Sequence, residues 1–173
     1  VLVPSISKLM AQKKKEDANK VVKFSLLATI LIGLPCTFGM MVFAEQILKL
    51  LYPNAPEGAQ LLQITSLTII LMMMAQTING VLQGIGKYRV PATALALGVI
   101  AKFILNLILI PIPSIGINGV AIGSIVCHII SFSIGFAVLK RSMKIKFDVN
   151  KFLIKPLLAT AIMCLISYLA YLL

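Results

Sequence analysis

Five long apolar stretches constrain the fold of this 173-residue chain more than any other feature. They cover roughly 21–44, 58–84, 91–110, 119–139 and 152–173. About 20 apolar residues in a helix, at about 1.5 Å each, cross a hydrocarbon core about 30 Å thick. The stretches lack the period-two alternation of barrel strands. The sequence therefore predicts an all-α, polytopic transmembrane helix bundle of about five spans.

The composition agrees with a lipid environment. Hydrophobic residues make up 60% of the chain and charged residues 12%, against about 45–50% and about 25% in soluble domains. The net charge of +11 comes from basic clusters between the apolar stretches. Nucleic-acid binding would instead require a basic face on a soluble fold. We therefore expect membrane lipid as a partner and exclude nucleic acid.

The basic clusters also predict the topology. Lys and Arg concentrate in 12–20, 85–90 and 140–151, whereas 45–57 carries one lysine and 111–118 carries no charge. Since basic loops remain in the cytoplasm, the three basic segments are expected to be cytoplasmic loops. The segment 45–52 between the first two stretches is short and amphipathic. It is either an interfacial helix or a cap on the first span.

Pro35 stands in the middle of the first stretch, two residues after Gly33. A proline removes a backbone hydrogen bond and clashes with the preceding turn, so a kink is expected there. The two residues are a candidate hinge. The alternative is an ordinary span, because proline and glycine are more frequent in membrane helices than in soluble ones.

Two glycine pairs are spaced four residues apart, Gly80 with Gly84 and Gly119 with Gly123. Small residues at this spacing allow two helices to approach closely. Helix packing is the interpretation of both pairs.

Three amides lie on one face of the second stretch: Gln76, Asn79 and Gln83. They follow the i, i+3, i+7 spacing of a helix face. Unsatisfied amides are costly in lipid, so this face is expected to contact other helices or water. Interhelical hydrogen bonding and the wall of a hydrated cavity both remain open as explanations.

Lys102 is the most informative single residue, because it lies deep within the third stretch and Asn106 shares its helix face. A charge at this depth requires a cavity or a partner. None of the five stretches contains a carboxylate. A substrate-binding role and a neutral, deprotonated amine are the two interpretations. Ser124 and His128 occupy the outer half and the middle of the fourth stretch.

The sequence offers little for enzyme chemistry. One histidine and five scattered acids provide no nucleophile with a base at a usable spacing. The three cysteines, at positions 36, 127 and 164, lie within apolar stretches and lack paired metal-ligand spacing. We expect no enzyme activity, no cofactor and no metal site.

Several motifs in order along the chain resemble MurJ-like and stage V sporulation protein B-like flippases of the multidrug/oligosaccharidyl-lipid/polysaccharide exporter superfamily. The motifs are Leu2-Val3-Pro4-Ser5-Ile6-Ser7, Ile32-Gly33-Leu34-Pro35, Leu50-Leu51-Tyr52-Pro53, Val81-Leu82-Gln83-Gly84-Ile85-Gly86-Lys87, and Ile117-Asn118-Gly119-Val120-Ala121-Ile122-Gly123-Ser124. The resemblance implies that residues 1–173 are part of the C-terminal lobe of a two-lobe transporter. The rest of the same chain would then be a partner.

The resemblance also implies a function. Such proteins move lipid-linked sugars, for example an undecaprenyl-linked peptidoglycan precursor, across the bacterial inner membrane by alternating access. Some relatives hold sodium on the helix that matches 91–110. Here Lys102 and Asn106 occupy that face, so the ammonium would replace the cation.

Two other functions remain open at this stage. A multidrug or cation antiporter of the same superfamily is disfavoured by the missing intramembrane acid. A non-transporting membrane scaffold in envelope or spore assembly would need no polar interior.

Overall fold

The computed structural model describes residues 2–52, 58–113, 115–143 and 154–172, which form seven helices and no strand. The all-α prediction is confirmed. The helices are α1 (Leu2–Ala11), α2 (Lys15–Val42), α3 (Ala44–Leu51), α4 (Gly58–Gly84), α5 (Arg89–Leu109), α6 (Asn118–Met143) and α7 (Lys155–Leu172).

Helices occupy all five predicted spans, and four of them (α2, α4, α5 and α6) are long and apolar enough to cross a membrane. The fifth stretch is confirmed only as a helix. Helix α7 comprises the 18 residues Lys155–Leu172, about 27 Å at helical rise.

Helices extend into all three predicted loops. Most of 12–20 is helical because α2 already begins at Lys15, where Glu16 and Asp17 complement the helix dipole. Likewise, α6 continues to Met143 with basic residues in its last turn, which is also favourable for the dipole. The remainder of the third predicted loop, 144–151, lies outside the described residues. The segment between α4 and α5 is only 85–88.

The amphipathic segment after the first span is a helix of its own, α3, separated from α2 at Phe43. Lys49 and Glu45 form an ion pair of 2.7 Å on its surface. Leu50 and Leu51 are 83% and 63% exposed. A short helix with exposed leucines next to charged residues has the character of an interfacial helix.

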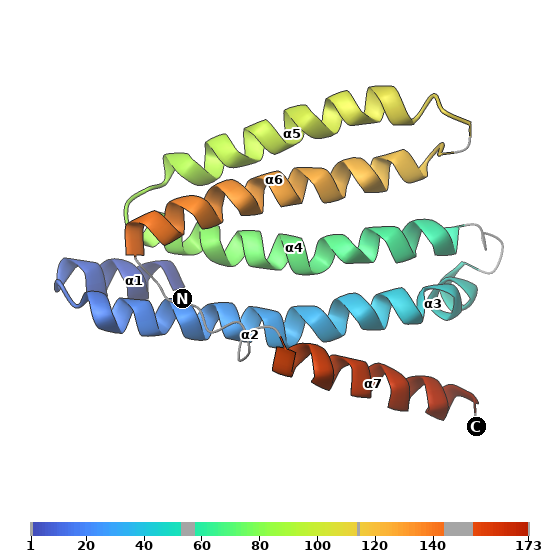
Figure 1. The fold of residues 1–173 in the computed structure, drawn as a ribbon, viewed down its shortest axis with the longest axis horizontal. Coiled ribbons are helices and arrows are strands. Elements are labelled where there is room, and N and C mark those ends of the chain that lie inside the picture. The colour runs from blue at the N-terminus through green and yellow to red at the C-terminus, as the bar shows by residue number, and fades with distance from the viewer. Residues whose placement is uncertain (1, 53–57, 114, 144–153, 173) are drawn as a thin grey trace.

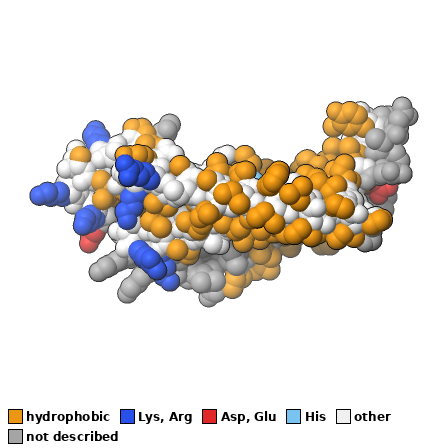
Figure 2. All heavy atoms as spheres, turned by 90° about the horizontal axis from the view of Figure 1, so that it is seen from above, with side chains coloured by type: hydrophobic (Ala, Val, Ile, Leu, Met, Phe, Trp, Pro, Cys, Tyr) orange, Lys and Arg blue, Asp and Glu red, His pale blue; other side chains and the backbone are white. Residues whose placement is uncertain are grey.

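Helix α4 lies at the centre of the bundle, between α2 and α6, and also contacts α1 and α3. Helix α5 packs mainly on α6, and α7 packs on α2 (Figure 1). The largest buried side chains join α1, α2, α4 and α6, and include Ile6, Leu26, Ile78, Leu82 and Leu139. Apolar side chains cover most of the surface seen in Figure 2.

Lys and Arg side chains gather at one end of the molecule (Figure 2). We call it the basic end. It holds α1, the start of α2, the end of α4, the start of α5 and the end of α6 (Figure 1). These helix ends belong to three segments that are far apart in the sequence: α1 with the start of α2, the connection from α4 to α5, and the end of α6. The three segments lie close together in space (Figure 1).

Glycines set the closest approaches between helices. A Cβ atom added to Gly98 of α5 would lie 2.7 Å from the Cys127 carbonyl oxygen of α6. On Gly119 it would lie 2.8 Å from Leu109 Cβ, and on Gly84 2.9 Å from Ile6 of α1. The packing role predicted for the two glycine pairs is confirmed.

We predict that Gly98→Ala and Gly39→Ala shift stability in opposite directions. An alanine at 98 meets the backbone of α6, so we expect a loss of about 1–3 kcal/mol. Nothing lies within 4 Å of a Cβ atom at Gly39, so the higher helix propensity of alanine should add up to about 1 kcal/mol. Unfolding of the purified full-length protein measures both. Equal shifts of the same sign would contradict this packing.

Candidate functional site

The side chains of Lys102 and Asn106 lie where α5 meets Gly123 of α6. A Cβ atom on Gly123 would collide with Asn106 Oδ1 and would lie 3.4 Å from Lys102 Cγ. Glycine at this position therefore makes room for two polar side chains between tightly packed helices. The two residues share one face, as the sequence predicts.

Lys102 lies deep along α5. It is about 20 Å from the start of the helix at Arg89 and about 10 Å from its end at Leu109, at helical rise. Side chains of a helix tilt toward its N-terminus, so the Lys102 stem points back toward the basic end, away from the nearer surface. The residue is half-buried and has no ion-pair partner among the described residues. Among the described residues, the polar group that lies beside it is the Asn106 side chain.

The facing helix contributes Ser124 and His128, both half-buried. The Ser124 hydroxyl donates to the Val120 carbonyl at 2.9 Å, so its hydrogen is used within α6. Ser124 and His128 each follow directly after a residue of α6 that contacts α5, namely Gly123 and Cys127. They therefore lie beside the interface that Lys102 and Asn106 occupy.

The three amides of α4 lie elsewhere. Asn79 faces Gly135 of α6, whereas Gln76 and Gln83 are exposed. Gly135 is twelve residues after Gly123, about 18 Å along α6. The structure therefore does not bring the α4 amides and the Lys102 group together in one contact. They form two polar sites at different depths along α6.

Asn79 and Asn106 share an unusual feature: the side-chain oxygen of each is buried and accepts no hydrogen bond from the described residues. Leaving such an acceptor unsatisfied costs about 1–3 kcal/mol. Asn106 also borders a hollow of about 340 Å³, lined otherwise by Phe103, Leu107, Ile110 and Pro111. Water or a bound ligand would satisfy these amides.

Pro35 lies within α2, as predicted, and Gly33 is buried against α4. A Cβ atom on Gly33 would lie 2.6 Å from Ile70 Cδ1 and 3.3 Å from Met73 Sδ. The Thr37 hydroxyl donates to the Gly33 carbonyl at 2.7 Å, a bond that often bends helices. Pro35 and the Thr37 hydrogen bond both favour bending of α2, next to the tight contact of Gly33 with α4.

Sequence reasoning missed a polar contact between α2 and α4. The hydroxyls of Thr29 and Thr77 lie 2.7 Å apart. Each hydroxyl also lies within hydrogen-bond distance of a carbonyl of its own helix, that of Ser25 at 2.8 Å and that of Met73 at 3.0 Å. Because a hydroxyl has one hydrogen to donate, one threonine donates to the other and the acceptor donates to its own helix carbonyl. The sequence shows only isolated threonines in two apolar stretches. Whether two of them meet depends on how α2 and α4 are aligned along each other.

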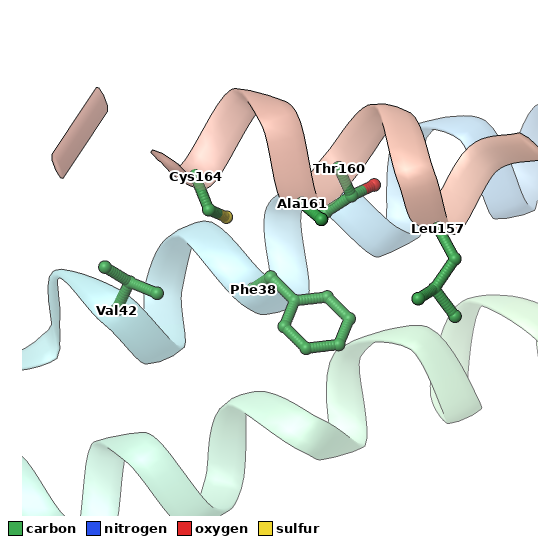
Figure 3. Close-up of a pocket in the computed structure, with 6 residues that line it drawn as sticks. All are labelled: Phe38, Val42, Leu157, Thr160, Ala161 and Cys164. Carbon is green, nitrogen blue, oxygen red and sulfur yellow. The ribbon is translucent and has the colours of Figure 1, made fainter. Parts of the chain in front are cut away.

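A cavity of about 110 Å³ between α2 and α7 was not predicted either (Figure 3). Its walls are Phe38, Val42, Leu157, Thr160, Ala161 and Cys164. The Thr160 hydroxyl donates to the Pro156 carbonyl at 2.8 Å, so the cavity offers little polar recognition. Among the described residues, no group of three or more His, Cys, Asp or Glu could hold a metal ion.

Four long apolar helices around polar groups that lipid cannot satisfy define a multi-pass membrane protein. The sequence model of the MatE family matches residues 2–108, more than half of the chain, so the chain belongs to the MatE family. This is a family of membrane transporters and not of enzymes.

Two relatives extend the comparison. The uncharacterized membrane protein YabM of Bacillus subtilis is 31% identical over 71% of this chain and 23% of its own length. The probable low-salt glycan biosynthesis flippase Agl15 of Haloferax volcanii is 24% identical over 87% of this chain and 32% of its own length. The chain thus spans a third or less of the curated relatives it matches. No solved structure matches it significantly.

We predict a measurable coupling between Thr29 and Thr77. A double-mutant cycle with Thr29→Val and Thr77→Val cancels whatever each threonine contributes within its own helix. The coupling free energy between the two hydroxyls should be about 0.6 kcal/mol and not above about 1.7 kcal/mol, the range for hydrogen bonds between membrane helices. Unfolding of the four purified proteins measures it. A coupling of zero would contradict the contact.

Proposed function

We propose that this chain is part of the C-terminal lobe of a flippase that moves a lipid-linked oligosaccharide across the cytoplasmic membrane by alternating access. The MatE family consists of transporters, and a relative over most of the chain is named as a probable glycan biosynthesis flippase. The finer proposal is an undecaprenyl-linked substrate such as a peptidoglycan precursor. The resemblance of the ordered motifs between Leu2 and Ser124 to MurJ-like proteins supports it.

The observation that carries this proposal is the ammonium group of Lys102. It lies deep in α5, within a helix interface, without an acidic partner among the described residues. A cation in a medium of low dielectric constant attracts a pyrophosphate strongly, because little solvent screens the charges. Asn106, on the same face, adds an amide that donates to phosphate or sugar oxygens.

The lack of acidic residues in four helices disfavours a cation antiporter. Helices α4, α5, α6 and α7 carry no Asp or Glu. Intramembrane carboxylates are the usual groups for proton or sodium coupling. A scaffold, in turn, gains nothing from a buried lysine that is expensive to keep in the membrane.

The proposal includes an orientation. The basic end would face the cytoplasm, because Lys and Arg mark cytoplasmic segments. Substrate would then enter from the side where the basic segments lie. Pro35 and Gly33 would form the hinge at which α2 bends between the two states, and the exposed Gln76 and Gln83 would line the wet side of α4.

We predict that Lys102→Met in the full-length protein lowers transport of the lipid-linked sugar at least about tenfold, as expected for losing a buried charge–phosphate contact worth about 1.4 kcal/mol or more. Methionine keeps the length of the side chain and removes its charge. Lys102→Arg should retain most of the activity. Lys23→Met, near the basic end of α2, is the matched control and should be nearly silent. Translocation in proteoliposomes measures all four proteins.

The second part of this experiment measures transport with and without sodium. If the Lys102 ammonium replaces a bound cation, the natural protein transports equally with and without sodium. Full activity of Lys102→Met would contradict the substrate role of Lys102. Strict sodium dependence together with a silent Lys102→Ala would contradict both the substrate role and the cation replacement.

A further inference from the structure

The basic end contains a cavity of about 380 Å³ that the proposed transport function does not use. Its lining comes from the α1, α2 and α6 helices: Met10, Lys15, Asn19, Ser142 and Met143. Membrane-spanning helices end near the lipid headgroups, and this cavity is formed at the ends of two candidate spans, α2 and α6. From this cavity we infer that the protein binds the phosphate group of an anionic phospholipid at the basic end.

Two lysine side chains lie at this cavity. Lys15 is exposed and lines it. Lys87 donates to the Ser142 hydroxyl at 2.9 Å, while Ser142 itself donates to the Val138 carbonyl at 2.6 Å. Ser142 thus holds the Lys87 ammonium beside the cavity. Neither lysine forms an ion pair within the described part of the chain. Both charges are available to an anion.

An unsatisfied amide adds a polar group to the wall. The Asn19 side-chain oxygen is buried and accepts no hydrogen bond from the described residues. Rotation of this carboxamide presents its NH₂ group, which donates to a phosphate oxygen. Buried polar groups are normally hydrogen-bonded, so an orphan amide beside two cations indicates a ligand or ordered water.

The rest of the wall favours a lipid over a soluble phosphate. Met10 is half-buried and Met143 is buried, and both are flexible apolar side chains that adapt to the shape of a neighbour. They offer a surface for the glycerol and upper acyl chain, which inorganic phosphate lacks.

The surrounding charge is mainly positive. The last turn of α6 carries Lys140 and Arg141, and Lys14 precedes α2. The first turn of α2 also carries two acids, Glu16 and Asp17, of which Asp17 is paired with Lys20 at 3.2 Å. Basic pockets between membrane helices are known to bind anionic headgroups.

The test compares two neighbouring lysines in full-length protein purified in detergent. Native mass spectrometry follows binding of phosphatidylglycerol and of zwitterionic phosphatidylcholine. Lys15→Ala should weaken phosphatidylglycerol binding about fivefold, the effect of one lysine near an anionic headgroup. Lys14→Ala removes the same charge one residue outside the cavity and should weaken it less than about twofold. Phosphatidylcholine binding should not change in either variant.

Ser142→Ala is a second variant, since it releases Lys87 from its position, and it should also weaken phosphatidylglycerol selectively. Equal effects of Lys14→Ala and Lys15→Ala would overturn the site in favour of a diffuse basic surface. Displacement of phosphatidylglycerol by millimolar inorganic phosphate would overturn the lipid as the ligand. These measurements need no transport, so their outcome is independent of the proposed flippase activity.

Discussion

Helices α5 and α6 approach each other at positions where one of them carries glycine. Gly98 meets the Cys127 carbonyl, and Gly119 meets Leu109. No hydrophobic effect drives apolar helices together in lipid, so close van der Waals contact has to do so. Between these two contacts, Gly123 leaves space, and Lys102 and Asn106 occupy it. The position of the polar pair therefore depends on the glycines of the facing helix.

Helix α6 has a second role, because its other contacts are with α4. Asn79 faces Gly135 there, about 18 Å along α6 from Gly123. The molecule therefore carries polar groups at two depths, one toward the basic end and one toward the opposite end. A substrate that crosses the membrane needs polar contacts at more than one depth, and a bundle that only packs does not. This arrangement agrees with the proposed transport.

Much of the fold follows from the sequence, because hydrocarbon thickness and helix geometry together fix the length of an apolar stretch. Helix α4 has the predicted bounds, and α5 differs by one or two residues. The start of α2 and the end of α6 extend beyond the predicted spans. Charged residues are typical of loops, but they are also favourable at the termini of a helix, so the sequence does not fix these two ends.

The sequence predicts which helix face carries the site residues, but it does not predict which other helix that face contacts. The spacing of Lys102 and Asn106 places them on one side of a helix, as the structure has them. Helical spacing carries no information on which helix that side contacts. The contact of Asn79 with Gly135, the Thr29–Thr77 bond and the cavity at Lys15 therefore appear only in three dimensions.

The central claim is that the Lys102–Asn106 face meets water and substrate during transport. Labelling of Asn106→Cys in full-length protein without its natural cysteines tests it directly, because a thiol reacts as a thiolate, which requires water. Ile104→Cys, on the opposite and exposed apolar face of α5, is the control. The account predicts that a membrane-impermeant reagent labels position 106 from alternating sides, with protection by substrate, and leaves position 104 unlabelled. Uniform protection of position 106 from both sides would contradict it.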